Sequence, residues 1–81
     1  MATMEPSYKT YYLDSLKDAW IATSNKYSTL QNAINAINGL PQSEINVGWL
    51  VRHGDWIVYR AGPCGNSTFR ISTRHLNLIG E

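Results

Sequence analysis

The alternation of apolar and polar residues is clearest over residues 47–60, VGWLVRHGDWIVYR, and it predicts a β-hairpin. Strong strand formers lie on both sides of a central segment, residues 52–55. Within that segment, His53-Gly54 suits a two-residue turn of type I′, and Gly54-Asp55 suits type II′. Both choices assign the side chains to the same two faces, because successive strand side chains point to opposite sides.

One predicted face of this hairpin is core-like. It holds Val47, Trp49, Val51, Trp56, Val58 and Arg60. The other face holds Gly48, Leu50, Arg52, Ile57 and Tyr59. This second face is more apolar than a solvated sheet face requires.

Residues 28–41 predict an amphipathic helix. Ser28 suits the N-cap position, and Gln31 three residues later completes a capping box. The apolar stripe that follows at helical spacing consists of Leu30, Ala33, Ile34 and Ile37. Asn38-Gly39 suits a left-handed C-cap, and Pro41 prevents continuation of the helix. We expect the stripe to pack on the core-like face of the hairpin.

The N-terminal part of the chain predicts a second hairpin. Residues 8–13 (YKTYYL) and 19–23 (AWIAT) are rich in aromatic and β-branched residues, with a turn at residues 14–18. A helix is the competing interpretation, because Leu16, Ala19 and Trp20 recur at helical spacing behind Asp14. The high content of aromatic and β-branched residues favours the hairpin.

The rest of the chain predicts connections and short strands. Residues 42–46 connect the helix to the central hairpin, and residues 61–67 form a turn-rich loop. Residues 68–72 (TFRIS) alternate as a strand with Phe69 and Ile71 inward. Residues 75–79 (HLNLI) form a last short strand or a tail along the sheet edge.

This order of elements predicts a small α+β fold. We expect an antiparallel sheet of four to five strands with one amphipathic helix packed on one face, in the order β-β-α-β-β-β. Residues 7–81 form the single domain, and residues 1–6 form a flexible tail. A domain of this size buries only roughly 60% of its unfolded surface, so partners often contribute to its stability.

The predicted helix covers only one face of the sheet. We therefore expect Leu50, Ile57 and Tyr59 to be covered by the chain ends, by curvature of the sheet or by another molecule. The last alternative predicts docking on a protein partner, or a homodimer, through this face. The expected partner-binding residues are Leu50, Arg52, Ile57, Tyr59 and Arg70.

Composition narrows the class of protein. The 81 residues are 43% hydrophobic and 16% charged, which is typical of a globular chain. A single cysteine, Cys64, excludes an internal disulfide framework and points to a reducing compartment, so we expect a cytoplasmic protein. The sequence contains no apolar run of signal-peptide or membrane-helix type, and we expect no membrane partner.

Charge suggests a second hypothesis. The net charge of +1 is too small for non-specific DNA attraction. Residues 1–46 carry a net −1 and residues 47–81 a net +2, with all four arginines in the second segment. Arginine suits phosphate recognition and stacking on aromatic rings, so the alternative function is binding of a nucleotide or single-stranded nucleic acid. The expected phosphate or nucleotide contacts are Arg60, Arg74, Gly65, Asn66 and Ser67.

Catalytic, cofactor and metal sites are not predicted. Cys64 with His53 or His75 is the one thiol–imidazole combination, yet these residues come from different predicted loops. Two histidines and one cysteine at scattered spacing do not make a zinc site. We therefore expect a non-enzymatic binding protein, an inhibitor or an adaptor. The short, asparagine-rich composition looks like that of compact accessory proteins such as phages encode.

Overall fold

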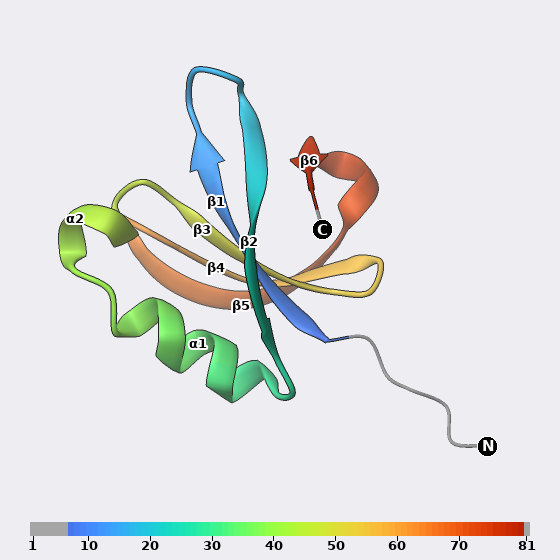
Figure 1. Ribbon diagram of the computed structural model, residues 1–81, viewed down its shortest axis with the longest axis horizontal. Coiled ribbons are helices and arrows are strands. Elements are labelled where there is room, and N and C mark those ends of the chain that lie inside the picture. Colours follow the sequence, from blue (N-terminus) through green and yellow to red (C-terminus); the bar gives the residue numbers. More distant parts are fainter. Residues whose placement is uncertain (1–6, 81) are drawn as a thin grey trace.

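The computed structural model describes residues 7–80, which form a six-stranded sheet with one principal helix (Figure 1). The expected flexible tail, residues 1–6, lies outside this range. The strands are β1 (Tyr8–Asp14), β2 (Ala19–Tyr27), β3 (Trp49–His53), β4 (Trp56–Gly62), β5 (Gly65–Ser72) and β6 (Leu78–Ile79). The helical elements are α1 (Leu30–Asn38), the short α2 (Gln42–Ile45) and the 3₁₀ turn η1 (Thr73–His75). The predicted α+β class is confirmed.

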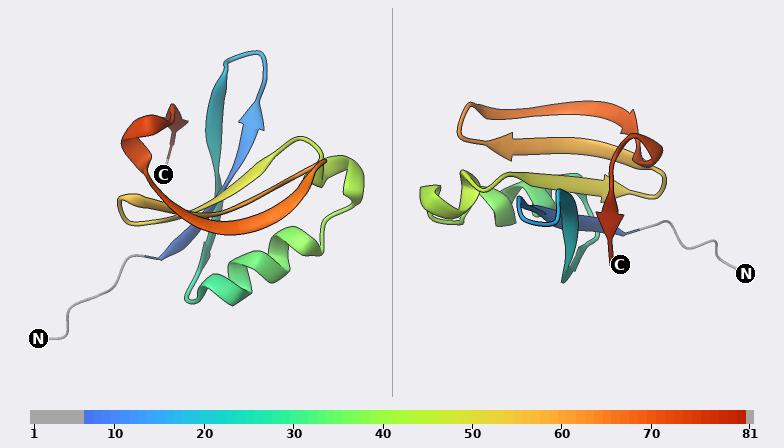
Figure 2. Two further views of the ribbon diagram at one scale, coloured as in Figure 1. Left: turned by 180° about the vertical axis from the view of Figure 1, so that it is seen from behind. Right: turned by 90° about the horizontal axis from the view of Figure 1, so that it is seen from above.

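The sheet is mixed and has one strand more than the upper limit of the prediction. Its strand order is β5-β4-β3-β1-β2-β6, and all neighbours are antiparallel except β2 and β6, which run parallel. β5 and β6 lie at opposite edges although they follow one another along the chain. The segment between them therefore crosses one face of the twisted sheet, which curls into a partly open barrel (Figure 2). We call the enclosed face the barrel side and the other face the helix side.

Of the two turns that the sequence allowed, the central hairpin has the one at Gly54-Asp55, because His53 pairs with Trp56. Gly54 has φ +63°, which a type II′ turn requires at its first central position. The predicted face assignment is correct for Trp56 and Ile57 and wrong from Tyr59 onward. A β-bulge leaves Val58 as an extra residue, so Tyr59 lies opposite Val51 on the helix side. Arg60 correspondingly lies opposite Leu50 on the barrel side.

The first hydrophobic core lies between α1 and the helix side of the sheet, as the apolar stripe predicts. Ala33 and Ile37 are buried there, with Leu30 and Ile34 packed at the margin. The sheet contributes Val51, Tyr59 and Ala61, with Trp49 and Val58 partly buried. Trp56 lies outside this core: it is 39% exposed and is covered on one ring face by Arg70, which corrects its predicted core position.

The ends of α1 differ from the predicted caps. Thr29, not Ser28, is the N-cap residue, and its side chain accepts a hydrogen bond from the Asn32 N–H. Gly39 has φ −78°, so the C-terminus has no left-handed cap. The Gly39 N–H instead donates to the Asn35 carbonyl and keeps the last turn right-handed.

The second hydrophobic core lies on the barrel side. Tyr11, Leu50 and Ile57 are buried in it. The side chains that cover them are Trp20, Ala22, Phe69, Ile71, Leu76 and Leu78. The sequence analysis expected this face to be covered by the chain ends, by curvature of the sheet or by another molecule. In the structure, the C-terminal end of the chain and the curvature of the sheet cover it. The expectation that Leu50 and Ile57 present an open docking surface is therefore wrong, and Tyr59 is buried on the other side.

Several element boundaries also differ from the prediction. β2 continues to Tyr27, and the expected connector at residues 42–46 contains α2. The expected loop at residues 61–67 is a tight hairpin, because Gly62 pairs with Gly65 and only Pro63-Cys64 turns. Gly65, Asn66 and Ser67 are therefore strand residues. Within residues 7–80, no helix is long and apolar enough to cross a membrane.

Candidate functional site

The mouth of the open barrel holds an apolar groove with a volume of about 490 Å³. Its apolar side chains come from β1, β2, β3, β5 and the segment after β5, residues 73–80, which we call the C-terminal segment. They include Leu13, Trp20, Leu50, Phe69, Ile71 and Leu76. Most of these side chains are only half-buried, so the barrel-side core continues into a surface that contacts solvent. Partly open barrels commonly bind ligands at such a mouth.

The strand register explains why these side chains converge. Leu13 pairs with Trp20 across the β1–β2 hairpin, and Trp20 in turn pairs with Leu78 of β6. The backbone N–H of Trp20 donates to the Asn77 carbonyl at 2.8 Å, which holds the C-terminal segment against β2. The C-terminal segment is thereby placed so that Leu76 forms part of the groove wall.

The rim of the groove near β3 depends on a glycine. Gly48 has φ +106°, and the Leu13 N–H donates to its carbonyl at 3.0 Å. A Cβ at this position would also approach Leu13 and Trp20 to 3.5 Å. Next to it, Val47 is 48% exposed and lines the groove. The chain can approach the hairpin this closely because Gly48 adopts the left-handed conformation without a side chain.

Arg60 supplies the one charge among the described residues that line this groove. It lies on the barrel side only because of the bulge at Val58, and its side chain is exposed. A guanidinium beside apolar side chains favours a ligand that combines an apolar group with a carboxylate or phosphate.

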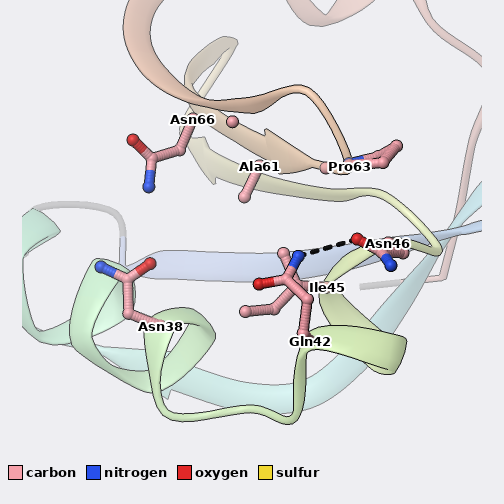
Figure 3. Close-up of a pocket in the computed structure, with 9 residues that line it drawn as sticks. Asn38, Gln42, Ile45, Asn46, Ala61, Pro63 and Asn66 are labelled. Carbon is pink, nitrogen blue, oxygen red and sulfur yellow. Dashed lines mark hydrogen bonds between the residues drawn. The ribbon is translucent and has the colours of Figure 1, made fainter.

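A second hollow, of about 620 Å³, lies on the other side of the β4–β5 hairpin end (Figure 3). Carboxamides dominate it: Asn38 from α1, Gln42 from α2, Asn46 beyond it and Asn66 from β5. Gln42 Nε2 donates to Asn46 Oδ1 at 2.7 Å, while Asn38 and Asn66 lie on opposite walls (Figure 3). We call this hollow the amide cleft. Its described lining carries no charged side chain.

The Tyr59 hydroxyl lies behind the amide cleft. It is 3.5 Å from Asn38 Oδ1, and its side chain is almost fully buried. Burial raises the pKa of this hydroxyl above its ordinary value of 10.0, and a hydrogen bond from the Asn66 side chain partly offsets the rise. Tyr59 is therefore a neutral donor at physiological pH.

The residues predicted to contact phosphate are brought together in part. Arg60, Gly65, Asn66 and Ser67 border one small hollow of about 260 Å³ at the β4–β5 turn, where Arg60 and Ser67 are a directly opposed pair. Arg74 lies in η1, beside Asp55 and Trp56, and does not join them.

The other two arginines are engaged within the protein. Arg52 Nε donates to the Gly54 carbonyl at 2.7 Å, and its Nη1 donates to the Tyr11 hydroxyl at 3.0 Å. It therefore does not depend on a partner molecule for hydrogen bonds. Arg70 lies on the helix side, with its guanidinium 4.0 Å from the centre of a Trp56 ring.

The aromatic residues on the helix side do not form an open stacking surface. His53 and Tyr8 stack face to face, with ring centres 3.9 Å apart and planes 11° apart. The exposed Trp56 already has Arg70 over its ring. Rings that pack on one another in this way leave fewer faces free for nucleic-acid bases, which need an open ring face to stack.

The thiol and imidazole groups lie far apart. Cys64 is an exposed free thiol in the β4–β5 turn, while His53 is at the other end of β4. The seven residues of β4 separate them by about 20 Å at the usual rise per residue. No group of three or more His, Cys, Asp or Glu side chains in residues 7–80 is placed to hold a metal ion.

Sequence reasoning missed most of the groove. Leu13 and Trp20 were predicted only as parts of a hairpin, and Val47 was predicted on the core-like face but is 48% exposed. The amide cleft was not predicted. One signal was present: Leu76 and Leu78 alternate in the C-terminal segment, so one side of that segment needs an apolar surface to cover. Which surface it covers depends on a contact between distant parts of the chain.

Comparison with protein families, with curated proteins and with solved structures finds no match for this chain.

Proposed function

We propose that the protein is a small non-enzymatic binding protein whose barrel groove takes an apolar anchor of a protein partner, with Arg60 pairing to a carboxylate beside that anchor. The observation that carries this proposal is the combination, in one groove, of half-buried apolar side chains with one exposed guanidinium. Apolar contacts at the centre of an interface supply most of its affinity, and a charge at its rim adds specificity.

This proposal keeps docking on a protein partner as the mode of action but assigns the contact to different residues. Leu50 contributes to the floor of the groove, while Val47, Arg60 and Phe69 replace Ile57 and Tyr59 as the accessible contacts. An inhibitor or adaptor of this kind works by occupying a partner's surface. The exposed free thiol of Cys64 fits a reducing compartment such as the cytoplasm.

Selection from a random peptide library displayed on phage tests the proposal. We expect the selected peptides to share a large apolar residue next to Asp or Glu. Val47→Asp and Arg60→Glu should each abolish their binding, because one places a charge in the groove and the other reverses its charge. Both side chains are exposed, so both variants should fold.

Arg74→Glu is the matched control, because Arg74 is also exposed but lies outside the groove. It should bind the selected peptides as the wild type does. Selected peptides that bind all three variants equally, or that share no apolar residue, would contradict the proposal.

A second candidate function is binding of a mononucleotide at the β4–β5 turn. The observation that favours it is the hollow bordered by Arg60, Asn66 and Ser67, with the amide cleft on the other side of the same turn. The guanidinium and the hydroxyl suit phosphate oxygens, and carboxamides suit the polar edge of a base.

Thermal unfolding with nucleoside mono- and diphosphates tests this second candidate. A ligand that binds only the folded state raises the melting temperature. We expect a rise that weakens with salt and is lost in Ser67→Ala, a variant that leaves the apolar groove intact. A melting temperature that no nucleotide changes would reject the candidate.

A further inference from the structure

The turn between β1 and β2, residues 15–18, carries an exposed apolar side chain at its tip. Leu16 is 97% exposed, far more than the next large hydrophobic side chain, Val47 at 48%, in the described part of the chain. Single exposed leucines are common on protein surfaces. Three further features of the molecule distinguish this one: a rigid turn, adjacent negative charge and a complementary groove.

Hydrogen bonds hold the turn that carries Leu16. Asp14 Oδ1 accepts from the backbone N–H of Leu16 at 3.0 Å and from that of Lys17 at 3.2 Å. Asp18 adopts φ +51°, a conformation that aspartate tolerates better than most residues. The leucine is therefore presented on an ordered turn, which reduces the entropy lost when it is bound.

The charges of the turn complement those of the groove. Asp14 and Asp18 flank Leu16 and outnumber the single cation, Lys17. Asp14 is engaged in the turn, whereas Asp18 is exposed and close to the leucine along the chain. The turn thus offers an apolar anchor with a carboxylate beside it, and the groove offers apolar walls with Arg60.

We infer that the occupant of the barrel groove is the β1–β2 turn of a second copy of this chain, with Leu16 against the apolar walls and Asp18 paired with Arg60. The inference rests on the proposed function of the groove and names its partner. The groove volume of about 490 Å³ lies in the range of sites that enclose small ligands, so a leucine side chain fits within it.

The position of the turn makes the contact reciprocal. Leu13 and Trp20, in the same hairpin as the turn, line the groove, whereas Leu16 itself points into solvent. The anchor and the groove therefore lie close together on one molecule, but the anchor does not fill its own groove. A two-fold axis between two copies brings each turn into the other groove, which closes the assembly as a dimer.

Sedimentation velocity over a concentration series tests the inference. We expect a wild-type dimer whose dissociation constant rises by roughly tenfold or more in Leu16→Ser, which removes the anchor. Asp18→Asn keeps a residue that tolerates positive φ but loses the charge, and it should weaken the dimer to a smaller extent and only at low salt. Lys17→Ser, in the same turn, is the matched control and should leave the dimer as strong or stronger.

A mixture of two variants gives a sharper test. Leu16→Ser retains an intact groove, and Arg60→Glu retains an intact turn, so each protein alone should dimerise more weakly than the wild type. Together they should form a heterodimer through the one intact turn–groove contact. Circular dichroism and urea unfolding check that each variant is folded.

Three outcomes would overturn the inference. They are a wild type that stays monomeric, a dimer that Leu16→Ser leaves unchanged, and a mixture that does not associate. Thr68→Pro tests another contact, because Thr68 lies in the edge strand β5 and proline disrupts strand pairing there. A dimer that dissociates in this variant alone would be formed by the exposed edge of β5. Failure here leaves the proposed function standing if peptides selected on the Leu16→Ser protein still require Val47 and Arg60. If no groove-dependent peptide is selected on that protein, the proposed function itself fails.

Discussion

Arg52 Nη1 donates a hydrogen bond to the Tyr11 hydroxyl at 3.0 Å, which joins β3 to β1 on the barrel side of the sheet. Tyr11 is fully buried, and Arg52 also donates to the Gly54 carbonyl in the adjacent turn. One side chain thus links the barrel core to the turn of the central hairpin. We expect this link to contribute to stability rather than to ligand binding.

Tyr11→Phe should lower the free energy of unfolding by about 1 kcal/mol, because it leaves a guanidinium N–H of Arg52 without its acceptor. Urea unfolding measures the change. Tyr12→Phe removes the same hydroxyl from the neighbouring residue, which packs near Trp49 with ring centres 5.8 Å apart. It should change stability by less than about 0.5 kcal/mol. Equal effects of the two substitutions would argue against a structural role for the Arg52–Tyr11 bond.

The difference in burial between two isoleucines predicts unequal effects for the same truncation. Ile57 is fully buried in the barrel-side core, whereas Ile79 in β6 is 42% exposed. Ile57→Ala should cost about 2–4 kcal/mol of unfolding free energy, and Ile79→Ala less than about 1 kcal/mol. Chemical denaturation with a common denaturant slope measures both. A small loss in Ile57→Ala would mean that the barrel side is looser than its burial indicates.

The raised pKa of the Tyr59 hydroxyl predicts that the protein loses stability at high pH. Burial raises the pKa of its hydroxyl above 10.0, so the folded state keeps a proton that the unfolded state loses once the pH exceeds about 10. The unfolded state then binds fewer protons, and the free energy of unfolding falls as pH rises. Below that pH both states are protonated and this contribution is constant.

Urea unfolding between about pH 8 and pH 11 measures this effect, with absorbance of the tyrosinate as a second readout. Tyr59→Phe should lower stability at neutral pH, because the hydroxyl bonds with Asn38 and Asn66 are lost. It should also flatten the fall above pH 10 relative to the wild type. Tyr12→Phe is the control and should retain the wild-type slope. Identical slopes in all three proteins would mean that Tyr59 ionises as an exposed tyrosine does.

The parts of this fold that follow from local spacing were predicted, and the parts that depend on distant contacts were not. The stripe from Leu30 to Ile37 places α1 on the sheet because helical periodicity identifies its apolar face. The conformational freedom of Gly54 limited the central turn to two positions, His53-Gly54 or Gly54-Asp55, and the structure has the second. Nothing in the run from Trp56 to Tyr59 distinguishes a bulged strand from a regular one, so the change of face after Val58 was not predictable.

The candidate site was less predictable for the same reason. The bulge transfers Tyr59 to the helix side and Arg60 to the barrel side, which exchanges a core residue for a charged groove residue. The parallel pairing of Leu78 with Trp20 brings together segments that are far apart in the sequence. Apolar content correctly indicated that the second face needs a cover, but only the topology shows that the C-terminal segment provides it.

Arg70 and Trp56 allow a direct measurement of a cation–π contact at the surface. The guanidinium lies 4.0 Å from the centre of a Trp56 ring, and both residues are exposed. A double-mutant cycle with Arg70→Ala and Trp56→Ala should give a coupling free energy of about 0.5–1 kcal/mol. Urea unfolding of the four proteins supplies the values.

Arg60→Ala combined with Trp56→Ala is the control cycle, and its coupling should be near zero because Arg60 lies on the opposite face of the sheet. A coupling in the Arg70 cycle no larger than in the control would mean that the contact does not stabilise the fold, and Arg70 would then be free to engage a ligand.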